Sequence, residues 1–488
     1  MGAVSPAAAG GRNRSLPSTG FALAAVASVI AVLAVGLMVL DAPLPLMMAL
    51  GFLVAIPFAL VRGVSYAETE ESVFEMAKRG FQPLLIFVAV GALISSWIMS
   101  GTVPTMIYFG LQLITPGLFL PTAIVLCALA SLVNGTNFGT VATIGVALMG
   151  VATALGIPAP VAAGAIICGA VFGDKMSPLS DTTVMAPGLS GAKLMPHLRH
   201  MLWTTVPAIV ITTVIFSLMG LGYHLDDAGT ARVATISNSL QDAFSIGWIP
   251  LIPPVLVLAL LVKRVEAFPA IMIGALAGVV VAVTYQGEGT TATLTALWEG
   301  YTAPKSLGEI AGLLSGGETG GALKMLGLGS IVLFALAIAG VFSAAGIMEA
   351  LLKAITPHLD TPRKLVPTTL GITLVFNMIG GAVNFAVAMG ATFMRPLYER
   401  MGLAPKNLSR AVEDSGTMTG PLIPWNATAV FTAGALGVSA GSFIPYLFFC
   451  FLTPLTSLIY GLTGFTIVKD DEAAAQAKVN EAPPAVTS

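Results

Sequence analysis

The sequence reads GDKMSPLSDTT at residues 173–183, and no Asp, Glu, Lys, Arg or His occurs from residue 81 to the first glycine of this stretch. An apolar region of that length provides several membrane crossings. An ionisable group at membrane depth costs at least about 2 kcal/mol, so Asp174, Lys175 and Asp181 are functional candidates. Pro178 disrupts the helix before it and leaves carbonyl oxygens free beside several hydroxyl groups. Such a set of oxygen atoms favours the binding of a hard cation.

The composition is that of a membrane protein that crosses the bilayer several times. Of the 488 residues, 56% are hydrophobic and 9% are charged, against about 25% charged residues in a typical soluble domain. The 53 glycines suit close packing and interruption of helices in a membrane. A net charge of −2 argues against a nucleic-acid partner.

Apolar runs and their interruptions divide the chain into two halves with the same order of parts. In the first half we expect spans at 21–40, 44–61, 81–100, 117–133, 138–155 and 201–223, a surface helix at 66–80, a polar break at 134–137, and an apolar run at 161–172 before the charged stretch. In the second half we expect spans at 249–262, 268–285, 326–345 and 443–467, a polar connection at 286–322, a polar break at 377–384 and a Pro-broken stretch at 415–426.

Dipeptides that recur at a nearly constant spacing support an internal duplication. Asn-Phe occurs at 137–138 and 384–385, Gly followed by a branched residue at 156–157 and 402–403, and a Pro-Leu pair at 178–179 and 421–422, so the offsets fall between 243 and 247. Setting Pro178 against Pro421 places Thr417 opposite Asp174. The second half would then offer a neutral oxygen where the first half offers a carboxylate.

The distribution of Lys and Arg orients the two halves. If the first span starts in the cytoplasm, the basic residues of both halves fall on the cytoplasmic side, and the loops 224–246 and 286–322 are external. The halves are then upside down relative to each other, which is the architecture of alternating-access transporters with a midplane site.

We therefore predict an all-α polytopic membrane protein built from two inverted structural repeats. Broken or re-entrant helices meet at the membrane midplane, in about twelve spanning or re-entrant segments. The predicted domains are a disordered cytoplasmic tail at 1–20, a first repeat at 21–223, a second, inverted repeat at 224–468 and a disordered cytoplasmic tail at 469–488.

Several candidate residues also have a simpler interpretation. Asp174 could cap a helix or be neutralised by Lys175, although adjacent residues do not face each other on a helix. Glu413 and Asp414 follow a charged stretch, so an interfacial position competes with a functional one. Asn426 could serve packing, because hydrogen bonds between membrane helices explain such amides nearly as well as ion binding does.

The four histidines fall in predicted connections. The absence of any Gly-Lys dipeptide excludes a phosphate-binding loop of the usual form.

The stretch 173–183, together with EDSGT at 413–417 and PLIPWN at 421–426, closely resembles the signatures of the NhaC-type sodium/proton antiporter family. The resemblance covers roughly residues 20–468. It implies an exchanger of the inverted-repeat ion transporter class in the bacterial inner membrane, which is not an enzyme and needs no cofactor. Some members of the family exchange malate and lactate or move amino acids.

We expect a secondary transporter that exchanges cytoplasmic Na⁺ for external H⁺, with a Na⁺- or H⁺-coupled carrier of a small organic acid or amino acid as the alternative. An ion channel is disfavoured by the duplicated, broken segments. The candidate Na⁺ ligands are Asp174, Ser177, Ser180, Asp181, Thr182, Asn137, Thr417 and Asn426. Asp174, Glu413 and Asp414 are the candidates for proton transfer.

The expected partners are Na⁺ and H⁺, with Li⁺ or a small organic anion or amino acid as further options, and the lipid bilayer. A homodimer is compatible with this interpretation. Both chain termini are expected in the cytoplasm.

Overall fold

The computed structural model describes residues 14–224, 226–304, 307–314, 320–355 and 359–470. Regular structure in these ranges is helical, apart from an isolated β-bridge between Leu403 and Lys469. The chain forms two compact units, one of residues 1–78 and 337–359 and the other of residues 79–336 and 360–488. Most of the two tails predicted at 1–20 and 469–488 lies outside the described residues.

The smaller unit contains the first three helices and a later helical segment. Its helices are α1 (Thr19–Met38), α2 (Leu44–Val61), α3 (Tyr66–Ala77), the second part of α17 (Ala322–Ala344) and α18 (Ile347–Ile355). The sequence predicted a short helix from residue 66, and α3 confirms it. Its start is fixed by a capping box, in which the Ser65 hydroxyl accepts from the Glu68 N–H and the Glu68 carboxylate accepts from the Ser65 N–H.

The larger unit contains all the candidate site residues. Up to residue 220 its helices are α4 (Phe81–Met99), α5 (Thr102–Leu113), α6 (Pro116–Asn134), α7 (Asn137–Thr140), α8 (Val146–Ala154), α9 (Ala159–Met176), α10 (Asp181–Ser190) and α11 (Leu194–Gly220). They are followed by α12 (Asp227–Ala243), α13 (Ile252–Val262), α14 (Ala267–Thr284), α15 (Thr290–Glu299), α16 (Glu309–Leu314), the first part of α17, α19 (Pro362–Gly380), α20 (Val383–Arg400), α21 (Pro405–Thr419), α22 (Ala427–Leu436), α23 (Ala440–Phe443) and α24 (Phe448–Thr463).

The helix lengths fit a protein that crosses a membrane several times. Within the described residues, nine helices are long and apolar enough to span a bilayer, and ten if α22 and α23, bent by 95° at their junction, count as one further span. Two shorter apolar helices occupy Ile249–Val262 and Phe448–Thr463. The chain is thus an all-helical polytopic membrane protein. The predicted number of about twelve segments also counted re-entrant ones and stays a prediction.

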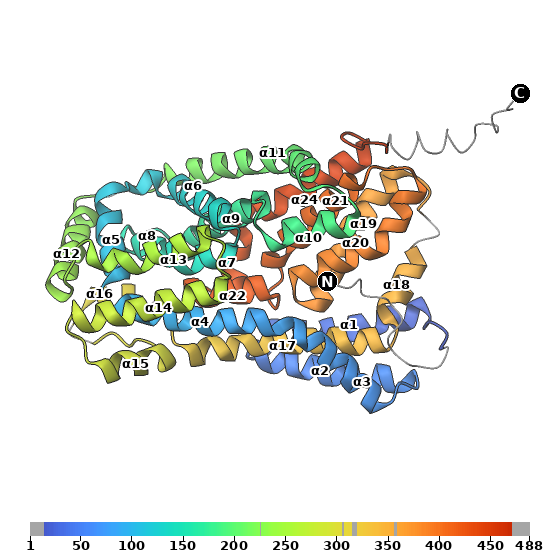
Figure 1. Ribbon diagram of the computed structural model, residues 1–488, viewed down its shortest axis with the longest axis horizontal. Coiled ribbons are helices and arrows are strands. Elements are labelled where there is room, and N and C mark those ends of the chain that lie inside the picture. The colour runs from blue at the N-terminus through green and yellow to red at the C-terminus, as the bar shows by residue number, and fades with distance from the viewer. Residues whose placement is uncertain (1–13, 225, 305–306, 315–319, 356–358, 471–488) are drawn as a thin grey trace, which may run out of the picture. The chain divides into compact units, whose positions relative to one another are not determined.

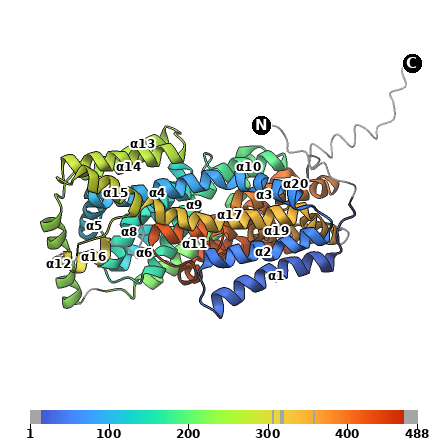
Figure 2. The same cartoon turned by 90° about the horizontal axis from the view of Figure 1, so that it is seen from below.

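Helices from different parts of the sequence lie side by side in the larger unit. α10 packs against α20 and α21 (Figure 1), and α4 and α14 run alongside each other in both views (Figure 2). α9 packs closely against α6. A Cβ atom added at Gly173 would lie only 2.3 Å from the Ala128 carbonyl oxygen, so no larger residue fits there. This glycine therefore permits the close approach that places the next residue, Asp174.

The helix bounds recur along the chain at a constant spacing. Both ends of α19 lie 246 residues after those of α6, and both ends of α22 lie 246 residues after those of α10. The glycines that end α6 and α19, Gly135 and Gly381, keep the same spacing, and both have the positive φ that favours glycine, 71° and 57°. At this spacing Pro178 corresponds to Pro424, which lies three residues after Pro421, the partner of Pro178 that the repeated dipeptides suggested.

Candidate cation site

The first break in the larger unit separates α9 from α10. α9 ends at Met176 and α10 begins at Asp181. Asp174 and Asp181 therefore lie on different helices rather than on one face of a continuous helix. Within the break, the Ser177 hydroxyl donates to the Leu132 carbonyl at 2.8 Å, which ties the break to the end of α6.

The carbonyl groups at the end of α9 have a partner within the protein. The Thr183 hydroxyl lies 3.3 Å from the Asp174 carbonyl oxygen and 3.0 Å from that of Lys175, and can donate to either. The sequence predicted that Pro178 would leave carbonyl oxygens free for a cation. Because α10 folds back against the end of α9, these two oxygens are engaged, and side chains become the main source of ligands.

The second break, between α21 and α22, uses its polar side chains differently. The Asn426 amide oxygen accepts from the Thr428 N–H at 3.0 Å and so caps α22. Its amide nitrogen donates to Asn377 at 2.7 Å, and Asn377 in turn donates to the Gly416 carbonyl and the Thr419 hydroxyl. The polar groups of this break therefore hold helices together.

A cavity of about 640 Å³ lies where the interruptions of several helices meet. Its wall combines the junctions α6–α7, α9–α10 and α19–α20 with α4, the α13–α14 turn and the start of α22. Six of the eight predicted Na⁺ ligands line it, namely Asn137, Asp174, Ser180, Asp181, Thr182 and Thr417. Ser177 and Asn426 do not line it, because their side chains hold the two breaks together.

Asp174 and Asn137 form the most suitable place for a cation in this cavity. The Asn137 amide nitrogen donates to the Asp174 carboxylate at 2.5 Å, and both residues are buried. The amide oxygen of Asn137 is also buried and has no hydrogen-bond partner. A carboxylate and an unpaired amide oxygen from neighbouring helices therefore both line the cavity, and these are ligands that hard cations prefer.

Further oxygen donors line the cavity near this pair. Ser180 and Thr182 are buried, with their hydroxyl oxygens 3.2 Å apart, whereas Asp181 is exposed. No three His, Cys, Asp or Glu side chains gather into a metal-binding cluster in the described part of the chain. A cation in this cavity would thus be held by a carboxylate and neutral oxygens.

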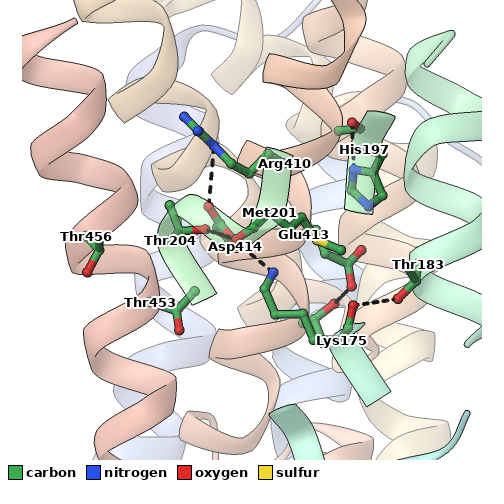
Figure 3. A network of polar contacts seen from close by, with 12 residues as sticks. Lys175, Thr183, His197, Met201, Thr204, Arg410, Glu413, Asp414, Thr453 and Thr456 are labelled. Carbon is green, nitrogen blue, oxygen red and sulfur yellow. Dashed lines mark hydrogen bonds and ion pairs between the residues drawn. The ribbon is translucent and has the colours of Figure 1, made fainter. Parts of the chain in front are cut away.

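A buried ion-pair network joins α9 and α21 (Figure 3). The Lys175 ammonium contacts the Asp414 carboxylate at 2.9 Å, and both side chains are completely buried. The same carboxylate accepts from the Thr204 hydroxyl at 3.0 Å, and its second oxygen lies 3.8 Å from Nε of Arg410. Lys175 thus pairs with α21 and not with Asp174.

Glu413, beside Asp414 on α21, has a different environment. It is completely buried, and one carboxylate oxygen accepts from the Thr417 hydroxyl at 2.8 Å. The other oxygen is buried without a hydrogen-bond partner. Since Thr417 lines the cavity, its side chain connects the cavity with this carboxyl group.

The buried groups around the site carry unequal charge. Lys175 and Arg410 are cationic, while Asp174, Glu413 and Asp414 are carboxylates. With all five ionised, one negative charge is in excess. Burial of an uncompensated charge costs several kcal/mol, so a bound cation or proton stabilises this arrangement.

The sequence placed His197 and His200 in a connection, and this prediction is wrong. Both are buried on α11, which begins at Leu194, and His197 Nδ1 lies 2.8 Å from the Ser409 hydroxyl on α21. Pro196 in the first turn was an available signal, because proline is tolerated at that position of a helix. Ser409 contacts His197, and Thr204 contacts Asp414, so both take part in the contacts between α11 and α21. No pattern in the sequence marked either residue as part of these contacts.

Comparison with known proteins supports a transporter. Residues 169–465 match the model of a family described as the Na⁺/H⁺ antiporter family. Over 458 residues, 94% of this chain and 98% of the relative, the chain is 34% identical to the Na⁺/H⁺ antiporter NhaC of Alkalihalophilus pseudofirmus. It is 35% identical to the malate-2H⁺/Na⁺-lactate antiporter of Bacillus subtilis, covering 87% of this chain and 90% of the relative. It is 32% identical to the arginine/ornithine antiporter ArcD of Halobacterium salinarum, covering 96% of each.

Proposed function

Because this chain belongs to the Na⁺/H⁺ antiporter family, we propose that it exchanges cytoplasmic Na⁺ for external H⁺ across a bacterial inner membrane. The observation that carries the proposal is the buried Asp174 carboxylate beside the unpaired Asn137 oxygen in the cavity wall. The chain is a transporter in this proposal rather than an enzyme, and both termini are cytoplasmic. A homodimer is compatible with it.

Asp174 and Asn137 form the centre of the proposed Na⁺ site. Ser180, Thr182 and Thr417 add neutral oxygens from the cavity wall, and the exposed Asp181 attracts the cation toward them. Ser177 and Asn426 were predicted as ligands, and their contacts instead favour a supporting role in the two breaks.

Competition between Na⁺ and H⁺ for one site couples the two ions. A proton on Asp174 or a Na⁺ beside it removes the excess negative charge, so each ion excludes the other. Glu413 is suited to hold or pass on a proton, because it contacts the cavity through Thr417 and lacks a direct cationic partner among the described ion pairs. Asp414, the third residue predicted for proton transfer, has Lys175 as a close partner.

Alternating access by two inverted repeats is the proposed transport mechanism. It is supported by the spacing of 246 residues between corresponding helices and by the breaks that meet at one cavity. The cavity wall includes the exposed Arg79 and Arg264. Since basic residues concentrate on the cytoplasmic side, we assign this conformation to the inward-facing state.

A small organic acid or amino acid is the second candidate substrate. A cavity of about 640 Å³ is far larger than one ion needs, and Arg79 and Arg264 offer cationic groups for a carboxylate. Two relatives are named for exchange of such solutes, malate with lactate and arginine with ornithine. In this case the site around Asp174 would bind the coupling ion.

Transport by the purified chain in proteoliposomes distinguishes the two candidates. An internal pH dye reports proton movement when Na⁺, Li⁺, K⁺, malate, lactate or arginine is added to vesicles with an imposed pH gradient. We expect Na⁺ alone to dissipate the gradient. If an organic solute is required, with or without Na⁺, the second candidate is correct, and if no solute acts, both are wrong.

A further inference from the structure

Three phenylalanine rings from separate parts of the chain pack together in the larger unit. Phe431 on α22 is completely buried, and its ring centroid lies 4.6 Å from that of Phe138 on α7 and 5.4 Å from that of Phe87 on α4. Both distances lie in the range that stabilises aromatic pairs, about 4.5–7 Å between centroids. α22 packs against both α4 and α7 (Figure 1), so Phe431 is the central ring of this aromatic cluster.

The aromatic cluster lies where the cavity ends. Phe138 lines the cavity and is half-buried, whereas Phe87 and Phe431 are buried and do not line it. Among the described residues, α4 lines the cavity only as far as Ile86, just before Phe87, and α22 lines it with its first two residues, one turn before Phe431. The cavity therefore reaches one side of the cluster and stops there.

The other end of the cavity carries exposed charged residues. Arg79, about two turns of helix before Phe87, is exposed and lines the cavity together with the exposed Arg264. Beyond Phe87, α4 is buried from residue 89 to residue 99. The cavity thus has one polar, exposed end and one end closed by packed apolar side chains, with the aromatic cluster at the boundary.

The aromatic cluster lies beside an irregular turn of helix. α7 continues directly into a π-helical turn at Val141–Gly145, which contacts both α4 and α22. Such turns are rare and frequently occur at functional sites. α7 also carries Asn137, a proposed Na⁺ ligand, immediately before Phe138. One short segment therefore joins the proposed ion site, the aromatic cluster and a point where regular helix geometry is interrupted.

Building on the proposed exchange, we propose that Phe87, Phe138 and Phe431 form the barrier that closes the cavity toward the opposite face of the membrane and thereby keeps the movements of Na⁺ and H⁺ coupled. An apolar constriction excludes water, and with it ions that keep their hydration shell. Alternating access requires such a barrier on one side of the site at a time. The three rings do not bind Na⁺, and they prevent its passage until the protein changes conformation.

Phe431→Ala removes the central ring and should uncouple the two ions. Phe87 and Phe138 then lose the ring that both of them contact, and water enters between α4, α7 and α22. We expect the number of Na⁺ moved per H⁺ to rise roughly tenfold or more, because an ion at membrane depth is excluded by at least that factor. The flux of radioactive Na⁺ and the signal of an internal pH dye, followed in the same proteoliposomes, measure this ratio.

Phe216→Ala is the matched control. Phe216 is completely buried on α11, its ring centroid lies 5.1 Å from that of Phe448, and it does not line the cavity. Its loss should lower thermal stability in detergent but leave the ratio of Na⁺ to H⁺ unchanged. Phe431→Leu restores apolar bulk and should keep the wild-type ratio. If Phe431→Ala lowered the rate and the stability but not the coupling, the ring would be a packing residue and the proposal would be overturned.

If Phe431→Ala is not inserted in the membrane, Phe138→Ala decides. The Phe138 ring is half-buried, so its removal disturbs the packing less. A raised number of Na⁺ per H⁺ supports the barrier, and the wild-type ratio overturns it. Absence of Na⁺-dependent exchange in the wild type would mean instead that the proposed function itself is wrong.

Discussion

The breaks α9–α10 and α21–α22 occupy corresponding places 246 residues apart, but their polar side chains make different contacts. Ser180 and Asn426 are the residues immediately before α10 and α22. Asn426 caps its helix with its side chain, whereas Ser180 makes no cap hydrogen bond and lines the cavity. The same backbone arrangement thus leaves side-chain oxygens available for a cation in the first break and engages them in helix contacts in the second.

The position of the carboxylates follows the same division. Asp174 corresponds at this spacing to Gly420, and Asp181 to Ala427, so the second break has no acid at either place. The acids of the second half, Glu413 and Asp414, lie about two turns of helix before Gly420. Helix bounds that recur at a constant spacing therefore do not imply the same chemistry, and substitutions in the two breaks should have different consequences.

The largest effect is expected at Asp174. Asp174→Asn keeps the size of the side chain but removes the negative charge for which Na⁺ and H⁺ compete in the proposed mechanism. We expect Na⁺-dependent proton movement in proteoliposomes to fall by roughly a hundredfold or more, the usual contribution of a positioned proton-transfer group. Asp242→Asn, at an exposed position on α12, is the matched control. Exchange within a few-fold of the wild type would remove Asp174 from the site.

A smaller effect is expected at Asp181, because its side chain is exposed. In a solvated environment a unit charge about 4 Å from a cation contributes about 1 kcal/mol. Asp181→Asn should therefore raise the apparent KM for Na⁺ about fivefold, with little change in the maximal rate. The measurement is the initial rate as a function of Na⁺ concentration. Complete loss of exchange would show that Asp181 is as central as Asp174.

The sequence was sufficient to predict the class of protein and several of the polar groups in the cavity wall. The long stretch without charges, ended by Asp174, marks the site, because buried ionisable groups are costly and therefore rare in membrane segments. The glycines and polar residues of the breaks locate the helix ends. Six of eight predicted ligands line one cavity for this reason.

The direction in which each side chain points could not be predicted. Sequence spacing did not indicate that Lys175 faces Asp414, since that contact joins segments 239 positions apart. Nor did the sequence indicate that the amide nitrogen of Asn426 donates to Asn377. That Asn426 binds Na⁺ stays a prediction. The sequence paired Pro178 with Pro421, three residues before Pro424. Both prolines lie in the same short stretch, and only the helix bounds show that Pro424 corresponds to Pro178.

Effects no larger than that at Asp181 are expected at Ser180 and Asn426, and they test the difference between the two breaks most directly. Ser180→Ala removes one neutral oxygen from the cavity wall. A neutral contact of this kind contributes about 0.5–1.5 kcal/mol, so the apparent KM for Na⁺ should rise roughly fivefold while thermal stability is retained.

Asn426→Ala removes a helix cap, which costs about 1 kcal/mol, and leaves the Asn377 amide oxygen without its partner. It should lower the unfolding temperature while the KM for Na⁺ stays near that of the wild type. Both properties are measured on both variants, by initial rates in proteoliposomes and by thermal unfolding in detergent. If Asn426→Ala instead raised the KM without loss of stability, Asn426 would belong to the Na⁺ site, and the two breaks would share the binding of the ion.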